Sequence, residues 1–109
     1  MGSLKEEKAA KYLENKGFSI VERNYYTWYG EIDIIARKNR ELYFVEVKYR
    51  KNANFGYPEE AVGAKKLHNM RLAANRYIIT HGISEDCPIK FSLVAILGDE
   101  IKMFESLTL

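Results

Sequence analysis

The sequence predicts one mixed α/β domain, in which helices flank a single mixed β-sheet. Several short runs are rich in β-branched and aromatic residues and are bounded by glycine or polar residues, as strands are. Two longer segments repeat apolar residues at helical spacing. These elements follow one another as α-β-β-β-α-β-β, an order that favours one mixed sheet with helical layers. A chain of 109 residues suits one core and is too short for two, so we assign residues 1–109 to one domain.

The first four elements are predicted from apolar spacing and turn residues. The stretch Leu4–Lys16 has a helical pattern and is followed by Gly17, a residue typical of helix ends. Strands are predicted over Phe18–Tyr25, Glu31–Arg37 and Leu42–Tyr49. Only 4 residues separate the last two strands, too few for a crossover connection, so these strands should form an antiparallel hairpin.

The second half of the chain begins with a polar loop over Arg50–Tyr57. Pro58 then occupies the first position of a helix that we predict to continue to about Thr80. Two glutamates in its first turn suit the helix dipole. The last predicted strands are Phe91–Leu97 and Ile101–Phe104.

The composition is that of an ordinary globular protein, with 47% apolar residues, 29% charged residues and a net charge of +2. No run approaches the roughly 20 apolar residues that a membrane helix needs, and the N-terminal residues lack the apolar stretch of a signal peptide. The single cysteine, Cys87, excludes an internal disulfide and suits a reducing compartment. We therefore expect a cytoplasmic protein that does not enter a membrane.

Four ionisable residues stand in or beside runs that otherwise read as buried strands. Glu31 and Asp33 belong to the second predicted strand, and Glu46 and Lys48 to the third. Ionised groups cost several kcal/mol each to bury unless a partner or a metal compensates them. These four residues are therefore the first candidates for a functional site.

The hairpin between these strands allows their register to be predicted. If Asn39-Arg40 forms a two-residue turn, opposed positions sum to 79, so Asp33 faces Glu46 and Glu31 faces Lys48. Two carboxylates so placed repel each other unless a divalent cation lies between them. A slip of one residue would put Asp33 and Glu46 on opposite faces of the sheet.

Metal-assisted hydrolysis of a phosphodiester uses such a set of residues. Mg²⁺, or Mn²⁺ in its place, binds carboxylate oxygens and bridges to a substrate phosphate, so Asp33, Glu46 and Glu31 are the predicted ligands. Lys48 is placed to offset charge that develops on phosphorus. The alternative is a solvated hairpin face on which Glu31 and Lys48 merely form a cross-strand ion pair.

Three segments of the sequence resemble a known family. Gly30–Asp33, Phe44–Arg50 and Gly56–Val62 resemble the YraN family of small bacterial proteins, which is similar to the PD-(D/E)xK endonucleases, archaeal Holliday-junction resolvases included. The resemblance extends from Glu6 to the last strands. It implies a restriction-endonuclease-like mixed β-sheet flanked by helices.

The resemblance also implies roles for particular residues. Asp33, Glu46 and Lys48 match the catalytic positions, and Glu6 matches an acid supplied by the first helix. The chain departs from the family pattern at Ser92, where many members carry aspartate, so an acid supplied from that strand is absent here.

Basic residues near the predicted site are candidates for binding nucleic-acid phosphates. Arg23, Arg50 and Lys51 bracket the acids in sequence, and Lys66 lies at the flank of the second long helix. Ordinary solvated charge is the competing interpretation.

Trp28 lies within the aromatic run Tyr25–Tyr29, which suits either a platform on which bases stack or core packing and cross-strand pairing. Of these two interpretations, packing is the one we prefer. On the second long helix, Leu72 and Ile79 interrupt the polar face and suggest a homodimer contact.

The leading interpretation is a metal-dependent nuclease acting on structured or single-stranded nucleic acid, with DNA favoured over RNA as the partner. The second is a nucleic-acid-binding module on the same fold with little or no turnover. The third is a structural or partner-binding protein in which the strand charges are merely paired.

Overall fold

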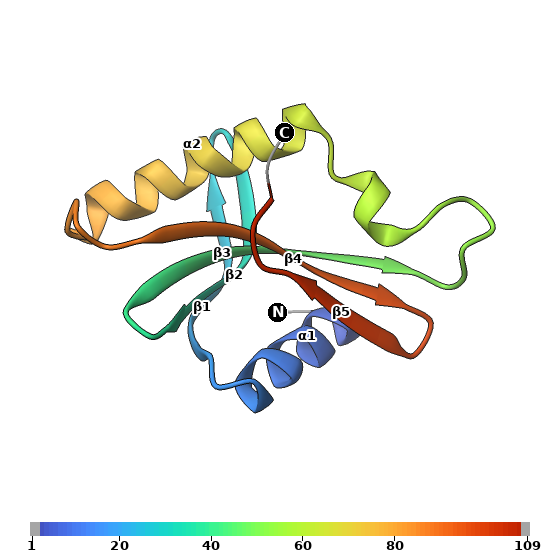
Figure 1. Cartoon of the computed structure of the whole chain (residues 1–109). Helices are drawn as coiled ribbons and strands as arrows, with labels where there is room; N and C mark the ends of the chain where they lie inside the picture. Colours follow the sequence, from blue (N-terminus) through green and yellow to red (C-terminus); the bar gives the residue numbers. More distant parts are fainter. Residues whose placement is uncertain (1–2, 108–109) are drawn as a thin grey trace.

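A computed structural model describes residues 3–107 of the chain, and its central feature is a mixed sheet of five strands in the order β1-β2-β3-β4-β5 (Figure 1). Neighbouring strands are antiparallel except for β3 and β4, which run parallel. The strands are β1 (Ser19–Thr27), β2 (Gly30–Lys38), β3 (Glu41–Arg50), β4 (Ile89–Leu97) and β5 (Glu100–Phe104).

The two α-helices cover opposite faces of this sheet (Figure 1). Helix α1 (Leu4–Asn15) precedes the first strand, and α2 (Ala64–Thr80) lies in the crossover that makes β3 and β4 parallel. Ala9 and Leu13 of α1 pack with Val45 on one face, whereas Met70 and Tyr77 of α2 pack with Phe44 on the other. Residues of β3 thus alternate between two cores, which explains the unbroken apolar run that predicted a strand buried on both faces.

The predicted fold class is confirmed. The elements follow the order α-β-β-β-α-β-β and build a mixed sheet with a helix on each face, as expected for the restriction-endonuclease-like class. Within residues 3–107, no helix is both long enough and apolar enough to span a membrane.

The helix predicted from Pro58 to about Thr80 is in fact two separate elements. The segment from Pro58 to Thr80 is not one helix: a short 3₁₀ helix, η1 (Pro58–Ala61), is separated from α2 by Val62 and Gly63. Val62 and Gly63 both have extended backbones, and the first turn of η1 is closed locally by Glu60, whose Oε1 accepts a hydrogen bond from the Tyr57 backbone N–H. Proline and the two glutamates therefore start a separate single turn, and α2 begins after the glycine.

The turn between β2 and β3 has the geometry that the register prediction required. Asn39 and Arg40 both have positive φ, 53° and 67°, as a type I′ turn demands. The Cα partners from Lys38–Glu41 to Ile34–Val45 all sum to 79, so the predicted register is confirmed over this part of the hairpin.

Replacing Arg40 with glycine should stabilise the protein. The left-handed conformation at this position costs an ordinary residue about 1–2 kcal/mol, a cost that glycine avoids. Part of this stabilisation is lost because glycine has greater conformational freedom in the unfolded chain. We expect Arg40→Gly to raise the free energy of unfolding by about 0.5–1 kcal/mol in urea titrations. Arg40→Ala removes the same side chain without relieving the backbone, so an equal gain in that control would contradict this explanation.

Candidate active site

The candidate site begins where β2 and β3 stop pairing through their backbones. Their paired residues end at Ile34–Val45, although both strands continue beyond this point. The next backbone N–H in line on β3, that of Val47, donates to Asp33 Oδ2 at 2.8 Å. The carboxylate of Asp33 thus bridges from β2 to β3 in place of a backbone carbonyl.

Glu46 lies beside this bridge and is almost completely buried, with 2% of its surface exposed. Its Oε2 atom is 3.5 Å from Lys48 Nζ and 3.4 Å from Lys66 Nζ. Its other oxygen, Oε1, has no hydrogen-bond partner among residues 3–107. A buried carboxylate oxygen without a partner is unfavourable, and a bound cation would satisfy it.

The proximity of the two carboxylates changes the protonation of Asp33. Burial, together with the negative charge of Glu46, raises the pKa of Asp33 to about 7. The hydrogen bond from the Val47 N–H acts in the opposite direction, and the charge of Glu6 adds a smaller upward contribution to the pKa. Asp33 therefore holds its proton well above the usual range of an aspartate, a property that clusters at functional sites.

Glu6 lies at the start of α1 and already has a structural role. Its Oε1 atom accepts a hydrogen bond from the Ser3 backbone N–H, and Ser3 Oγ accepts one from the Glu6 N–H, so the two residues form a capping box. The charge of Glu6 contributes to the raised pKa of Asp33, and the role of Glu6 as an acid of the site stays a prediction.

The prediction that Glu31 faces Lys48 across the β2–β3 hairpin is wrong. The paired residues of β2 and β3 end before Glu31 could face Lys48, and the Cα partner of Glu31 lies on β1, at Tyr26. Lys48 instead pairs with Glu46 on its own strand. The predicted register is confirmed for the residues that pair, but the pairing of β2 and β3 ends before it reaches Glu31 and Lys48.

The acids of the described part of the chain do not form a three-ligand cage. No three His, Cys, Asp or Glu side chains of residues 3–107 gather closely enough to hold a metal ion. Asp33 and Glu46 remain as the two carboxylates near each other. Mg²⁺ keeps several waters and is commonly bound through one or two carboxylates plus substrate phosphate, so this donor set fits such an ion.

The predicted phosphate-binding residues fall into three situations. Lys66 reaches from α2 to Glu46, as its place on the helix flank suggested. Arg50 and Lys51 are exposed at the end of β3. Arg23 is engaged elsewhere, because its guanidinium forms an ion pair of 2.9 Å with Glu7 on α1.

The aromatic run before Glu31 is divided between the core and the surface. Tyr25 packs edge-on against Tyr77 of α2, with ring centroids 5.4 Å apart. Trp28 is fully exposed, and Tyr26 and Tyr29 are also exposed. Core packing is therefore wrong for Trp28, Tyr26 and Tyr29, whereas the predicted cross-strand pairing is confirmed for Tyr26, whose Cα partner on β2 is Glu31.

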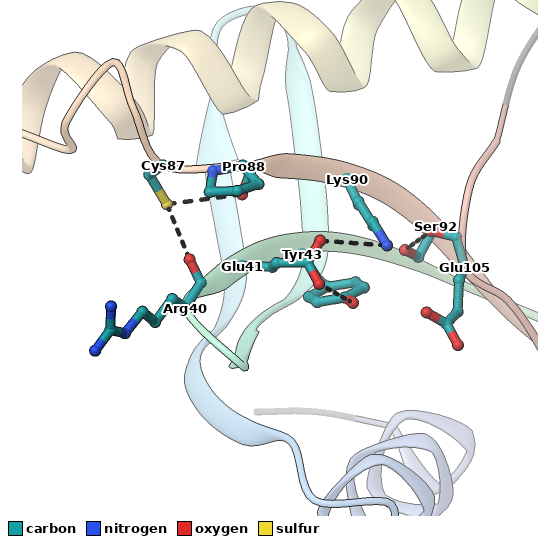
Figure 2. A network of polar contacts seen from close by, with 8 residues as sticks. All are labelled: Arg40, Glu41, Tyr43, Cys87, Pro88, Lys90, Ser92 and Glu105. Atoms are coloured by element: carbon teal, nitrogen blue, oxygen red, sulfur yellow. Dashed lines mark hydrogen bonds and ion pairs between the residues drawn. The ribbon is translucent and has the colours of Figure 1, made fainter.

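Figure 2 shows Ser92 in a polar network, where it contacts Glu105. Its hydroxyl is completely buried and donates to the Glu105 backbone carbonyl at 2.6 Å. Ser92 shares a face with Val94, which packs on the α1 side, whereas Glu46 shares a face with Phe44 on the α2 side. The absence of an acid at Ser92 thus removes no carboxylate from the face that carries Glu46.

One contact in the site has no signal in the sequence. The backbone N–H of Val47 holds the Asp33 carboxylate, and a main-chain donor of this kind is present at almost every position of a chain. Lys66 gave a weak signal, through its helical position beside the core stripe of α2.

These features define a small mixed α/β domain with two buried carboxylates in its sheet and two lysines, Lys48 of β3 and Lys66 of α2, that contact one of them. The model of the uncharacterised protein family UPF0102 matches residues 5–96, and the chain belongs to this family, which is the YraN family that the sequence motifs resemble.

Full-length relatives support this assignment. The UPF0102 protein of Lachnoclostridium phytofermentans is 42% identical over 105 residues, which cover 96% of this chain and 89% of the relative. The UPF0102 protein FN1370 of Fusobacterium nucleatum is 41% identical over 107 residues, covering 98% and 89%. The relative from Syntrophomonas wolfei is 47% identical over 103 residues, covering 94% and 88%.

The raised pKa of Asp33 predicts how stability varies with pH in the absence of divalent metal. The folded-state pKa of about 7 lies above the ordinary value of 3.8, so between these values the folded protein binds more protons than the unfolded chain. Stability contributed by protonated Asp33 is therefore present at low pH and is lost as pH rises through about 7.

Asp33→Asn keeps an acceptor for the Val47 N–H and does not titrate. We expect its melting temperature, measured in chelator, to exceed that of the parent by a margin that grows from pH 5 to pH 8, a window of ~3 pH units around the shifted pKa.

Asp99→Asn is the matched control, because it also removes one negative charge but lies in the exposed turn between β4 and β5. If the two variants show the same pH profile relative to the parent, burial of Asp33 beside Glu46 does not control stability in this range.

Proposed function

We propose that this protein is a metal-dependent nuclease, which hydrolyses phosphodiester bonds in nucleic acid at the site formed by Asp33, Glu46 and Lys48. The observation that carries the proposal is the buried Oε1 atom of Glu46, which lacks a hydrogen-bond partner in the described chain and lies next to an aspartate of raised pKa. Two carboxylates held together in this way are unfavourable for a fold alone and are suited to sharing a cation such as Mg²⁺ or Mn²⁺.

Each residue of the site has a distinct role in this proposal. Asp33 and Glu46 would hold the cation, and the Val47 N–H keeps Asp33 in place. When bound, the cation supplies Lewis-acid polarisation of a phosphoryl oxygen and activation of the attacking water. Lys48 is about one-third exposed, so its ammonium can reach both Glu46 and a phosphate, where it stabilises charge that develops during attack.

Nucleic acid, and DNA in particular, is the proposed partner because the basic residues near the site suit phosphates. Arg50 and Lys51 are exposed at the end of the strand that carries Glu46 and Lys48, and Lys66 contacts Glu46 from the helix. A homodimer formed through α2 is a separate proposal, which rests on Ile79 being exposed on that helix.

A specific observation favours the second candidate, a nucleic-acid-binding module without turnover. Glu46 is contacted by two ammonium groups, Lys48 at 3.5 Å and Lys66 at 3.4 Å, which compensate its charge without a cation. In such a module the two lysines would stabilise Glu46, and their exposed sides would bind a phosphate that is not cleaved.

Divalent cations should stabilise the parent protein and not Asp33→Asn. A ligand that binds only the folded state raises stability by RT ln(1 + [L]/Kd), about 2.7 kcal/mol at a hundredfold excess over Kd. We expect Mg²⁺ or Mn²⁺ to raise the melting temperature of the parent in a thermal-shift titration, with no rise for the variant. Equal shifts for both proteins would place the cation somewhere other than Asp33.

Lys48→Met separates chemistry from binding. This substitution keeps much of the apolar stem and removes the ammonium, so it eliminates an interaction that is needed chiefly in the transition state. On a panel of duplex, single-stranded, flapped and four-way-junction DNA and RNA, we expect it to abolish metal-dependent cleavage while leaving affinity within about three-fold of the parent.

Arg50→Ala is the matched control for that experiment. Because Arg50 is exposed and lies outside the carboxylate pair, its loss should weaken binding and lower the salt slope by about one counterion without abolishing cleavage. If the parent cuts no substrate of the panel, and Lys48→Met weakens binding as much as Arg50→Ala does, the binding module is the correct function.

A further inference from the structure

The tip of the β1–β2 hairpin exposes aromatic rings that contribute little to the core. Trp28 is 100% exposed, Tyr26 69% and Tyr29 52%. Single exposed apolar side chains are common on protein surfaces, but three aromatic rings within four residues form a patch that needs a reason.

The hairpin does not need these rings to form its turn. The hydroxyl of Thr27 donates to the Gly30 carbonyl at 2.8 Å and accepts hydrogen bonds from the backbone N–H groups of Tyr29 and Gly30. One threonine thus closes the turn through its own side chain, and Trp28 projects from a turn that is already fixed.

The exposed rings border a pocket that also includes a positive charge. The pocket has a volume of about 200 Å³ and is lined by residues Tyr25 to Tyr29 together with Arg76 of α2. No carboxylate contributes to this lining. Aromatic faces beside an arginine, without an acid, suit a planar ring that carries a phosphate.

The pocket lies on the same side of the molecule as the candidate active site. The hairpin tip reaches α2 (Figure 1). Gly30 lies so close to this helix that a β-carbon at position 30 would be 3.4 Å from Asn69 Cβ. Asn69 is one helical turn from Lys66, which contacts Glu46. Along β2, Gly30 and Asp33 are roughly 10 Å apart at the usual rise per residue. A single strand of nucleic acid could therefore lie along α2 from the pocket to the carboxylates.

We propose that Trp28, Tyr26, Tyr29 and Arg76 form a binding site for an unpaired nucleotide, with the base stacked on the aromatic rings and its phosphate beside Arg76. Bases within a duplex are already stacked on their neighbours and cannot lie on these rings, whereas bases of a single strand, flap or junction arm can. This inference rests on the proposed function, and it narrows the substrate to nucleic acid with an unpaired segment next to the cleaved bond.

Trp28 is the only tryptophan of the chain, so its fluorescence reports on this pocket alone. The experiment uses Asp33→Asn in chelator, so that binding is measured without cleavage. It is titrated with a 12-nucleotide single strand, with a blunt duplex of that strand, and with an abasic strand of equal length; the length of about 12 lies within the site sizes known for single-strand-binding domains. We expect the single strand to quench Trp28, and the duplex and the abasic strand to leave its emission unchanged.

Affinities measured by fluorescence anisotropy of a labelled strand test the individual residues. Tyr26→Ala and Trp28→Ala should each weaken binding of the single strand by about fivefold or more, and Trp28→Phe should restore most of the affinity. Arg76→Ala should weaken binding of the single strand and the abasic strand alike. Val21→Ala, which also removes an exposed apolar side chain but lies on β1 away from the hairpin tip, is the matched control and should leave affinity unchanged.

The outcomes separate this inference from the proposed function. Equal quenching by duplex and abasic strand, or unchanged affinity in Trp28→Ala, would overturn the nucleotide pocket even if the parent protein cleaves DNA. A change in oligomeric state of Trp28→Ala with unchanged affinity would overturn it in favour of a contact between copies of the chain. Base-dependent quenching by a protein that cleaves nothing would support the pocket and leave the nuclease proposal to fail alone.

Discussion

The hydrogen bond between the Val47 N–H and the Asp33 carboxylate is the contact on which the candidate site depends. It replaces a backbone bond at the point where β2 and β3 stop pairing, so the sheet remains tied together while a carboxylate enters its centre. Because this carboxylate is fixed beside Glu46, each acid is buried next to another negative charge. The unusual protonation of Asp33 and the unsatisfied oxygen of Glu46 both follow from this placement.

Both faces of the sheet carry an apolar core, but the candidate site lies on the α2 side alone. On the α1 side, Val45 and Val94 form a continuous apolar core, and the buried hydroxyl of Ser92 is satisfied by a backbone carbonyl. On the α2 side, β3 presents Glu46 and Lys48, and Lys66 reaches Glu46 from the helix. A fold can tolerate unfavourable charges at one place when the rest of its core is well packed, and such places are often functional.

The register of the β2–β3 hairpin could be predicted because Asn39 tolerates the left-handed backbone of a two-residue turn, and one correct turn fixes every pair that follows it. The prediction that Glu31 faces Lys48 was wrong because a sequence pattern does not show where two paired strands separate. The helix starting at Pro58 was predicted too long because one turn can satisfy its own backbone groups before Gly63. The exposure of Trp28 could not be predicted, since an aromatic run has the same appearance in a core and at a hairpin tip.

The central claim is that Asp33 and Glu46 share one divalent cation. A crystal structure of the protein soaked in Mn²⁺, with anomalous scattering data, tests it most directly. We expect an anomalous peak at roughly 2.0–2.3 Å from an oxygen of each carboxylate, with water in the remaining positions. At least one of Lys48 and Lys66 should then have moved away from Glu46. A structure in which both lysines remain on Glu46, with no peak between the two acids, would contradict the claim.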